Sequence, residues 1–101
     1  MDQAKNGFTN SLVPNEFFLS QNYPNPFKDK TVIKYCIAYT TKVELSVYNS
    51  NGKLIDNLVD KEQNAGSYEA EFDAAFLQEG TYRYQLKTYN YIESKEMILK
   101  K

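Results

Sequence analysis

The segment Gln21-Asn22-Tyr23-Pro24-Asn25-Pro26-Phe27 constrains the fold of this chain more than any other stretch. Each proline fixes its own φ at about −65° and moves the preceding residue out of the helical region. Asn22 and Asn25 can bond to the nearby backbone as Asx-turns, which replaces partners that a strand ladder would supply. We therefore expect residues 21–27, here called the plug, to form a stiff, extended connection that Tyr23 and Phe27 fix against a core.

Apolar residues that follow the plug recur with a period of two, which is the pattern of strands with one buried face. The clearest case is 42–48, where Val43, Leu45 and Val47 alternate with polar residues. The pattern and the turn signals between strands predict an all-β fold, an immunoglobulin-like antiparallel sandwich of about seven strands. The predicted strands are 17–21, 31–38, 42–48, 53–59, 67–73, 81–89 and 91–100.

Glycines mark two of the predicted turns. Asn51-Gly52 supplies the positive φ values of a tight hairpin, and Gly66 follows Ala65 at the next turn. The strand between these turns, 53–59, is expected at an edge or with a bulge, because Ile55 disturbs its alternation.

The crossover between the fifth and sixth predicted strands carries a further signature. Residues 74–77 are too few to nucleate a helix. Leu77-x-x-Gly80-x-Tyr82 is typical of a tyrosine corner, in which the phenolic hydroxyl bonds back to the preceding crossover. Asp73, just before the crossover, is expected to satisfy backbone groups of its own turn.

Length and composition limit the number of domains and the classes of partner. The 101 residues suffice for one domain, which we place at 17–101, after a polar segment at 1–16 with the composition of a flexible linker. The 12 Lys and Arg against 13 Asp and Glu leave a net charge of −1, which argues against nucleic acid or an anionic membrane as the main partner. No apolar run approaches the roughly 20 residues that span a bilayer.

Few residue types suited to catalysis are present. The chain has no histidine, the commonest general base and metal ligand. The single Cys36 has no partner for a disulfide within the chain and is expected to be a small buried hydrophobe. The acidic side chains considered for a metal site or a glycosidase pair are Asp56, Asp60, Glu62, Glu69, Glu71, Asp73 and Glu79.

The pattern of these acidic residues disfavours both kinds of site. Glu69 and Glu71 fall on one solvent face, and no Asp-x-Asp-x-Asp-Gly calcium loop is present. A sandwich of this size has little room for a glycosidase cleft. We therefore predict no catalytic, cofactor-binding or metal-binding residue, unless Asp73, Glu71 and a tyrosine converge on a cavity.

The nine tyrosines leave a sugar-binding surface open as an alternative. Tyr35, Tyr68 and Tyr82 fall on the apolar face of their predicted strands, as does Tyr84, and are expected in the core. Tyr89 and Tyr91 are not assigned in this way.

The run Lys95-Glu96-Met97-Ile98-Leu99-Lys100-Lys101 predicts a last strand with a basic end. A strand at a chain end is accessible to an external receptor in a way that an internal strand is not. Edge strands of small sandwiches also pair with one another, so a homodimer of the isolated domain is a further expectation.

Taken in order, these features resemble the type A C-terminal sorting domain of the type IX (Por) secretion system of Bacteroidetes, over residues 17–101. The middle of the pattern is also similar to the immunoglobulin-like domain of the flagellar hook-capping protein. The resemblance rests on Phe18-x-x-Gln21 and the plug, Thr31-x-Ile33-x-Tyr35, Val43-x-Leu45-x-Val47-Tyr48, Asn51-Gly52, Leu58-Val59, Ala65-Gly66, Phe72-Asp73, Leu77-x-x-Gly80-x-Tyr82-x-Tyr84-x-Leu86 and Lys95-x-Met97-x-Leu99-x-Lys101.

The resemblance implies a non-catalytic secretion signal on a secreted or cell-surface protein. It implies an upstream cargo domain, carriage through the type IX translocon, and removal of the signal before Phe17 by a sortase-like surface peptidase that in the family can link the cargo to lipopolysaccharide. Neither nucleic acid nor a small-molecule substrate is implied. The residues expected to be recognised in translocation are Lys95, Met97, Leu99, Lys100 and Lys101. The expected structural motif comprises Asn22, Tyr23, Pro24, Asn25, Pro26, Phe27, Gly52, Gly66, Asp73, Leu77, Gly80 and Tyr82.

An accessory binding module of a secreted enzyme, either carbohydrate-binding or a spacer, is the alternative function. Deletion of residues 96–101 separates the two, because only a secretion signal needs its last strand for export.

Overall fold

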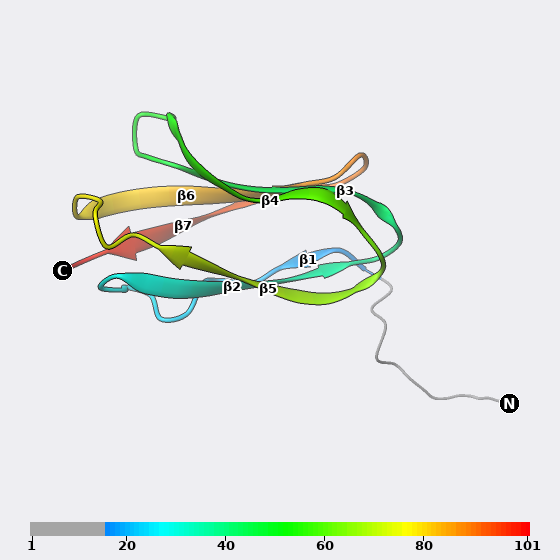
Figure 1. The fold of residues 1–101 in the computed structure, drawn as a ribbon, viewed down its shortest axis with the longest axis horizontal. Helices are drawn as coiled ribbons and strands as arrows, with labels where there is room; N and C mark the ends of the chain where they lie inside the picture. The colour runs from blue at the N-terminus through cyan, green and yellow to red at the C-terminus, as the bar shows by residue number, and fades with distance from the viewer. Residues whose placement is uncertain (1–15) are drawn as a thin grey trace, which may run out of the picture.

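Two antiparallel β-sheets packed face to face form the part of the chain that the computed structural model describes, residues 16–101 (Figure 1). The predicted linker at 1–16 lies outside this part except for Glu16. Within it, the all-β sandwich of seven strands is confirmed. The strands are β1 (Phe18–Leu19), β2 (Lys30–Ile37), β3 (Thr41–Tyr48), β4 (Leu54–Gln63), β5 (Gly66–Asp73), β6 (Gly80–Lys87) and β7 (Ile92–Leu99).

The smaller sheet has the order β1-β2-β5, and the larger has the order β4-β3-β6-β7. Alternate residues of each long strand face the space between the sheets, so the period-two pattern becomes a core. The predicted inward residues of β2, β3 and β6 are indeed buried. The buried hydrophobic residues are Leu19, Phe27, Ile33, Tyr35, Ile37, Val43, Leu45, Val47, Phe72, Ala74, Tyr82, Tyr84, Leu86, Met97 and Leu99.

Strand β4 lies at an edge of the larger sheet, and its pairing with β3 is interrupted by two register shifts. The prediction of an edge or bulged strand is therefore confirmed. The strand is longer than predicted and ends at Gln63, which pairs with Thr41. The extension could not be recognised from apolar alternation, because Asp60, Lys61 and Glu62 are all polar and exposed.

The predicted turns take the expected forms. Gly52 has a φ of 82°, and the Asn49 side chain accepts hydrogen bonds from the backbone N–H groups of Asn51 and Lys53, both at 2.9 Å. Asp73 accepts a bond from the backbone N–H of Ala75 at 3.0 Å, as predicted.

The crossover between β5 and β6 is a turn rather than a helix, as predicted. The Tyr82 hydroxyl donates to the carbonyl oxygen of Gln78 at 2.7 Å, which confirms the tyrosine corner. Residues 16–101 contain no helix of the length and apolar character that crossing a bilayer requires.

A candidate recognition element formed by the plug and strand β7

The plug crosses from one sheet to the other. At its start, Tyr23 pairs with Val32 of β2 through two backbone hydrogen bonds of 3.0 Å. At its end, Phe27 forms a parallel bridge with Leu99 of β7. The peptide bonds that precede Pro24 and Pro26 are both cis. The plug therefore closes the side of the sandwich at which β7 is the edge strand.

Asn22 lies at the centre of a buried polar network. Its side chain is only 2% exposed, and its Nδ2 donates to the carbonyl oxygen of Pro24 at 3.1 Å and to Oγ1 of Thr31 at 3.0 Å. Thr31 Oγ1 in turn donates to the same carbonyl at 2.8 Å. The predicted Asx-turn is wrong here, because that turn needs an N–H two residues on and Pro24 has none.

Asn25 also departs from the predicted Asx-turn. Its Oδ1 accepts a hydrogen bond from the backbone N–H of Ile98 at 2.9 Å. The N–H of Phe27, which an Asx-turn would require, donates instead to the carbonyl oxygen of Ile98 at 2.9 Å. The side chain of Asn25 thus forms a hydrogen bond with β7 rather than with the backbone of its own turn.

The two aromatic rings of the plug have opposite environments. Phe27 is 1% exposed and meets Phe72 edge-on, with ring centroids 6.2 Å apart. Tyr23 is 81% exposed. The prediction that both rings fix the plug against the core is therefore right for Phe27 and wrong for Tyr23. At this end the plug is held by the backbone pairing of Tyr23 with Val32 and by the buried side chain of Asn22.

The outer edge of β7 is less accessible than the sequence suggested. Gln21 Nε2 donates to the carbonyl oxygen of Glu96 at 2.7 Å, and the N–H of Lys100 donates to the carbonyl oxygen of Phe27 at 2.8 Å. Together with the two bonds at Ile98, these contacts occupy the C-terminal half of the edge. The expectation of a freely accessible last strand is corrected accordingly.

The side chains expected to be recognised divide into two groups. Met97 and Leu99 are buried in the core, so a receptor cannot touch them while β7 remains in the sheet. Lys100 and Lys101 are exposed, and Lys101 Nζ donates to the carbonyl oxygen of Ala75 at 2.6 Å. Lys95 is half-buried and lies 3.4 Å from the Glu93 carboxylate. Recognition of these residues by a translocon stays a prediction.

A comparison with protein-family models matches residues 21–100 to the family described as secretion system C-terminal sorting domain. The chain belongs to this family. The match starts at the first residue of the plug and ends one residue beyond β7, so it includes both segments that the fold joins. Searches of curated proteins and of solved structures gave no significant match. The family is that of the type IX secretion system, and its role is that of a C-terminal secretion sorting signal.

Tyr84 is the residue of the sorting domain whose role sequence reasoning missed. It was placed in the core, but its hydroxyl also donates to the carbonyl oxygen of Ser20 at 2.6 Å and accepts from the N–H of Asn22 at 2.8 Å. The hydroxyl therefore links β6 to the start of the plug. A tyrosine rather than a phenylalanine at a core position was the available signal, since a buried phenolic hydroxyl usually has a partner.

Burial raises the pKa of Tyr84 to about 12. In the unfolded chain the phenol titrates at about 10, so between these pH values the unfolded chain binds fewer protons than the folded one. The free energy of unfolding must therefore fall as pH rises from about 10 to about 12, and the contribution is fully present below about 10.

Tyr84→Phe should flatten this decline. Urea unfolding at neutral pH and at two pH values between about 10 and 12 measures it. Part of the decline remains in the variant, because burial and the Glu93 carboxylate also raise the pKa of Tyr91 to about 12. At neutral pH the variant should lose about 1–3 kcal/mol, since the groups at Ser20 and Asn22 lose their partner. An unchanged slope between wild type and variant would count against this role of the hydroxyl.

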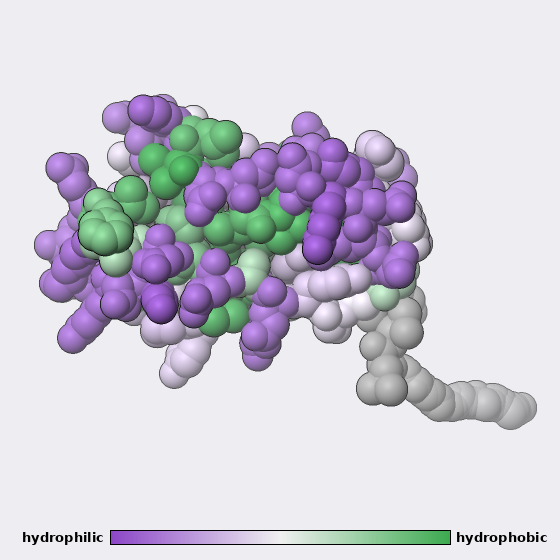
Figure 2. Space-filling view, viewed as in Figure 1, coloured by the Kyte–Doolittle hydropathy of each residue, from purple (hydrophilic) through white to green (hydrophobic). Residues whose placement is uncertain are grey.

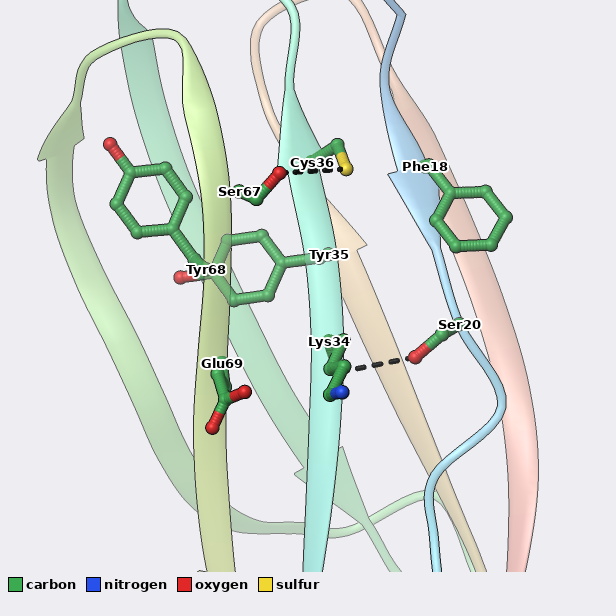
Figure 3. A pocket seen from close by; sticks show the side chains of 8 residues that line it. All are labelled: Phe18, Ser20, Lys34, Tyr35, Cys36, Ser67, Tyr68 and Glu69. Carbon is green, nitrogen blue, oxygen red and sulfur yellow. Dashed lines mark hydrogen bonds between the residues drawn. The ribbon is translucent and has the colours of Figure 1, made fainter. Parts of the chain in front are cut away.

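A shallow depression of about 410 Å³ lies on the outer face of the smaller sheet (Figure 3). Phe18, Lys34 and Glu69 reach it from three different strands, with one positive and one negative charge and no converging set of polar groups. Cys36 also lines it and is half-buried, with its Sγ 3.6 Å from Oγ of Ser67. The prediction of a buried cysteine is therefore wrong, because Cys36 faces outward on β2.

The acidic residues do not form the convergent site that would favour an enzyme. Glu71 lines a depression of about 420 Å³ between β4 and β5 together with Tyr35 and Tyr68, but Asp73 does not. The Tyr35 hydroxyl donates a hydrogen bond to Oε1 of Gln63 at 2.9 Å. In the part of the chain that the structure describes, no three acidic or cysteine side chains come together as metal ligands.

Exposed aromatic residues lie at both ends of the sandwich, and at one end Tyr39 and Tyr91 both pack against Phe17. Tyr89 is 79% exposed in the β6–β7 loop, whereas Phe76 is fully exposed in the β5–β6 crossover at the opposite end of the sandwich (Figure 1). Figure 2 shows an apolar area on the face in view, towards the end of the sandwich that carries the β5–β6 crossover. Tyr91 is half-buried and stacks on Phe17 at 5.1 Å. A sugar-binding surface stays a prediction.

Proposed function

We propose that this sorting domain directs a cargo protein, joined to its N-terminal side, through the type IX translocon and across the outer membrane. One observation carries the proposal: the family match extends from the plug to β7, and the fold binds these two segments to each other by backbone and side-chain hydrogen bonds. The plug and β7 lie together only when the domain is folded. A signal made of both segments would therefore be recognised after folding.

The finer assignment is to the type A sorting domains, with an immunoglobulin-like fold similar to that of the flagellar hook-capping protein. The strand order supports a sandwich of this general kind. The translocon and a sortase-like surface peptidase are the proposed partners, and the domain itself is proposed to be non-catalytic. The cargo would be secreted or displayed at the cell surface.

Removal of the domain is proposed to occur before Phe17. The Phe17 ring stacks on Tyr91 and meets Tyr39 edge-on, each at 5.1 Å, so Phe17 belongs to the packed part of the domain. A peptidase needs an extended, accessible segment, and the polar stretch 1–16 has the composition for one. That stretch lies outside the described residues, apart from Glu16.

Within the basic end, the exposed lysines are proposed to make the contact with the translocon, while Met97 and Leu99 hold β7 in position. This division follows from burial, because Lys100 and Lys101 are exposed and Lys95 is half-buried, whereas Met97 and Leu99 are buried. Charges at the edge of an interface act mainly on encounter and selectivity.

Reversal of the charges at Lys100 and Lys101 should therefore impair export without unfolding the domain. For a reporter fused to the domain, Lys100→Glu with Lys101→Glu should reduce the secreted fraction by about tenfold or more, equivalent to about 1.4 kcal/mol of binding. The matched control is Lys53→Glu with Lys61→Glu, two exposed lysines at and beside β4. Equal export of the two double variants, at equal thermal stability, would rule out recognition of the basic end.

A further inference from the structure

We infer that the plug is a built-in cover for the outer edge of β7, and that it prevents this edge from pairing with a strand of another chain. The inference goes beyond secretion, and it is testable on the isolated chain whether or not the domain is an export signal. The surface concerned is the row of outward-facing backbone groups from Glu96 to Lys100.

The two edges of the larger sheet are protected in different ways. An exposed edge strand is a template for another strand unless it is bulged, charged or covered. On β4, the two register shifts and the charged run Asp60-Lys61-Glu62 provide that protection. β7 carries charges at Glu93, Lys95 and Glu96, but it has neither a bulge nor a proline and pairs with β6 in one unbroken register from Gly80↔Leu99 to Lys87↔Ile92. On such a regular edge, a cover adds to the protection that the charges give.

The plug supplies partners to this edge where they are needed. The N–H of Ile98 donates to Oδ1 of Asn25, and its carbonyl oxygen accepts from the N–H of Phe27. Both backbone groups of Ile98 therefore face away from β6, as the alternation of an antiparallel ladder requires. The carbonyl of Glu96 and the N–H of Lys100, which continue the same row, are bonded to Gln21 and Phe27.

The cover separates into a buried support and exposed contacts. Asn22 and Phe27 are buried and hold the plug on the sandwich. The bonds from Gln21 and Asn25 to β7 lie in solvent-exposed surroundings. Gln21 Nε2 also donates to Oδ1 of Asn22 at 2.8 Å, but Asn22 keeps its bonds to Pro24 and Thr31 when Gln21 is replaced. Removal of the two exposed side chains should therefore uncover part of the edge while Phe27 stays buried.

Without the plug, an extended strand of another chain could pair with the outer edge of β7. We take this strand to be β7 of a second copy of this chain. Its exposed Ile92 and Ile98 would add apolar contact to an antiparallel pair. A strand-paired dimer through β7 is thus the species that the plug suppresses.

The double variant Gln21→Ala with Asn25→Ala in the full chain tests the cover directly. Hydrogen exchange followed by NMR should show the Ile98 amide exchanging about tenfold faster or more, since it loses its acceptor. The amides of Met97 and Leu99, which face β6 by the same alternation, should keep their protection. An unchanged rate at Ile98 would overturn the inference.

Sedimentation velocity then measures the consequence. The double variant should self-associate at concentrations at which wild type does not, and addition of Ile98→Pro should reverse this. Proline removes the outward N–H at position 98 and costs no bond to β6. The control Asn64→Ala with Asn90→Ala deletes two exposed side-chain hydrogen bonds elsewhere and should behave as wild type. Faster exchange at Ile98 without any added association would overturn the inference that the cover prevents pairing.

Discussion

Replacement of Phe27 by alanine should lower the free energy of unfolding of the sorting domain by about 3–5 kcal/mol, the usual cost of deleting a buried aromatic ring. Phe27 is 1% exposed, packs against Phe72, and belongs to the segment that bonds to β7. The substitution leaves a cavity and also weakens the attachment of the plug. Since small domains are stable by about 5–15 kcal/mol, this is a large share of the total. Urea unfolding followed by circular dichroism measures it.

Tyr23→Ala is the matched control within the same plug. Its ring is 81% exposed, so the variant should stay within about 0.5 kcal/mol of wild type. Equal losses for Tyr23→Ala and Phe27→Ala would mean that the plug is not attached through Phe27. The comparison also has a functional use, because reduced export by the stable Tyr23→Ala variant would identify the exposed ring as a contact for the translocon.

Truncation before Glu96 should abolish cooperative folding altogether. The deleted residues include Met97 and Leu99, both buried, and removal of each side chain alone costs about 2–5 kcal/mol. The truncation also removes the β7 partners of Phe27. The loss is comparable to the whole stability of a domain of this size. Far-ultraviolet circular dichroism and the dispersion of amide NMR signals report the result.

A shorter truncation distinguishes folding from recognition. Removal of Lys100 and Lys101 alone deletes one backbone bond to Phe27 and the contact of Lys101 with Ala75, and should cost about 1–2 kcal/mol. If the longer truncation kept a cooperative transition, β7 would not be part of the core. Because we expect it to unfold the domain, a loss of export on deletion of residues 96–101 does not by itself identify a recognition signal.

The parts of the fold that depend on local pattern could be predicted from the sequence. The alternation of Val43, Leu45 and Val47 indicates both a strand and its buried face, because side chains in a strand alternate between two faces. The spacing from Leu77 to Tyr82 indicates the tyrosine corner for a similar reason, since donor and acceptor lie only four residues apart.

The partners of the plug could not be predicted in the same way. Asn25 and Ile98 are separated by 73 positions, and nothing in the local sequence relates them. Asn22 and Asn25 both lie within two residues of a proline, yet Asn22 is buried with Thr31 and Asn25 bonds to an exposed edge. The contrast between exposed Tyr23 and buried Phe27 likewise depends on tertiary packing, which decides which side of an irregular segment faces the core.

We propose that this domain is a type IX export signal. The most direct test of this proposal fuses residues 1–101 to the C-terminus of a periplasmic reporter enzyme in a bacterium with a type IX system and in an isogenic strain without the translocon. We predict that the reporter reaches the cell surface or the medium only in the first strain, and that the unfused reporter stays in the periplasm of both. Retention of the fusion in the periplasm of the strain with a working translocon, with the domain folded, would contradict the account.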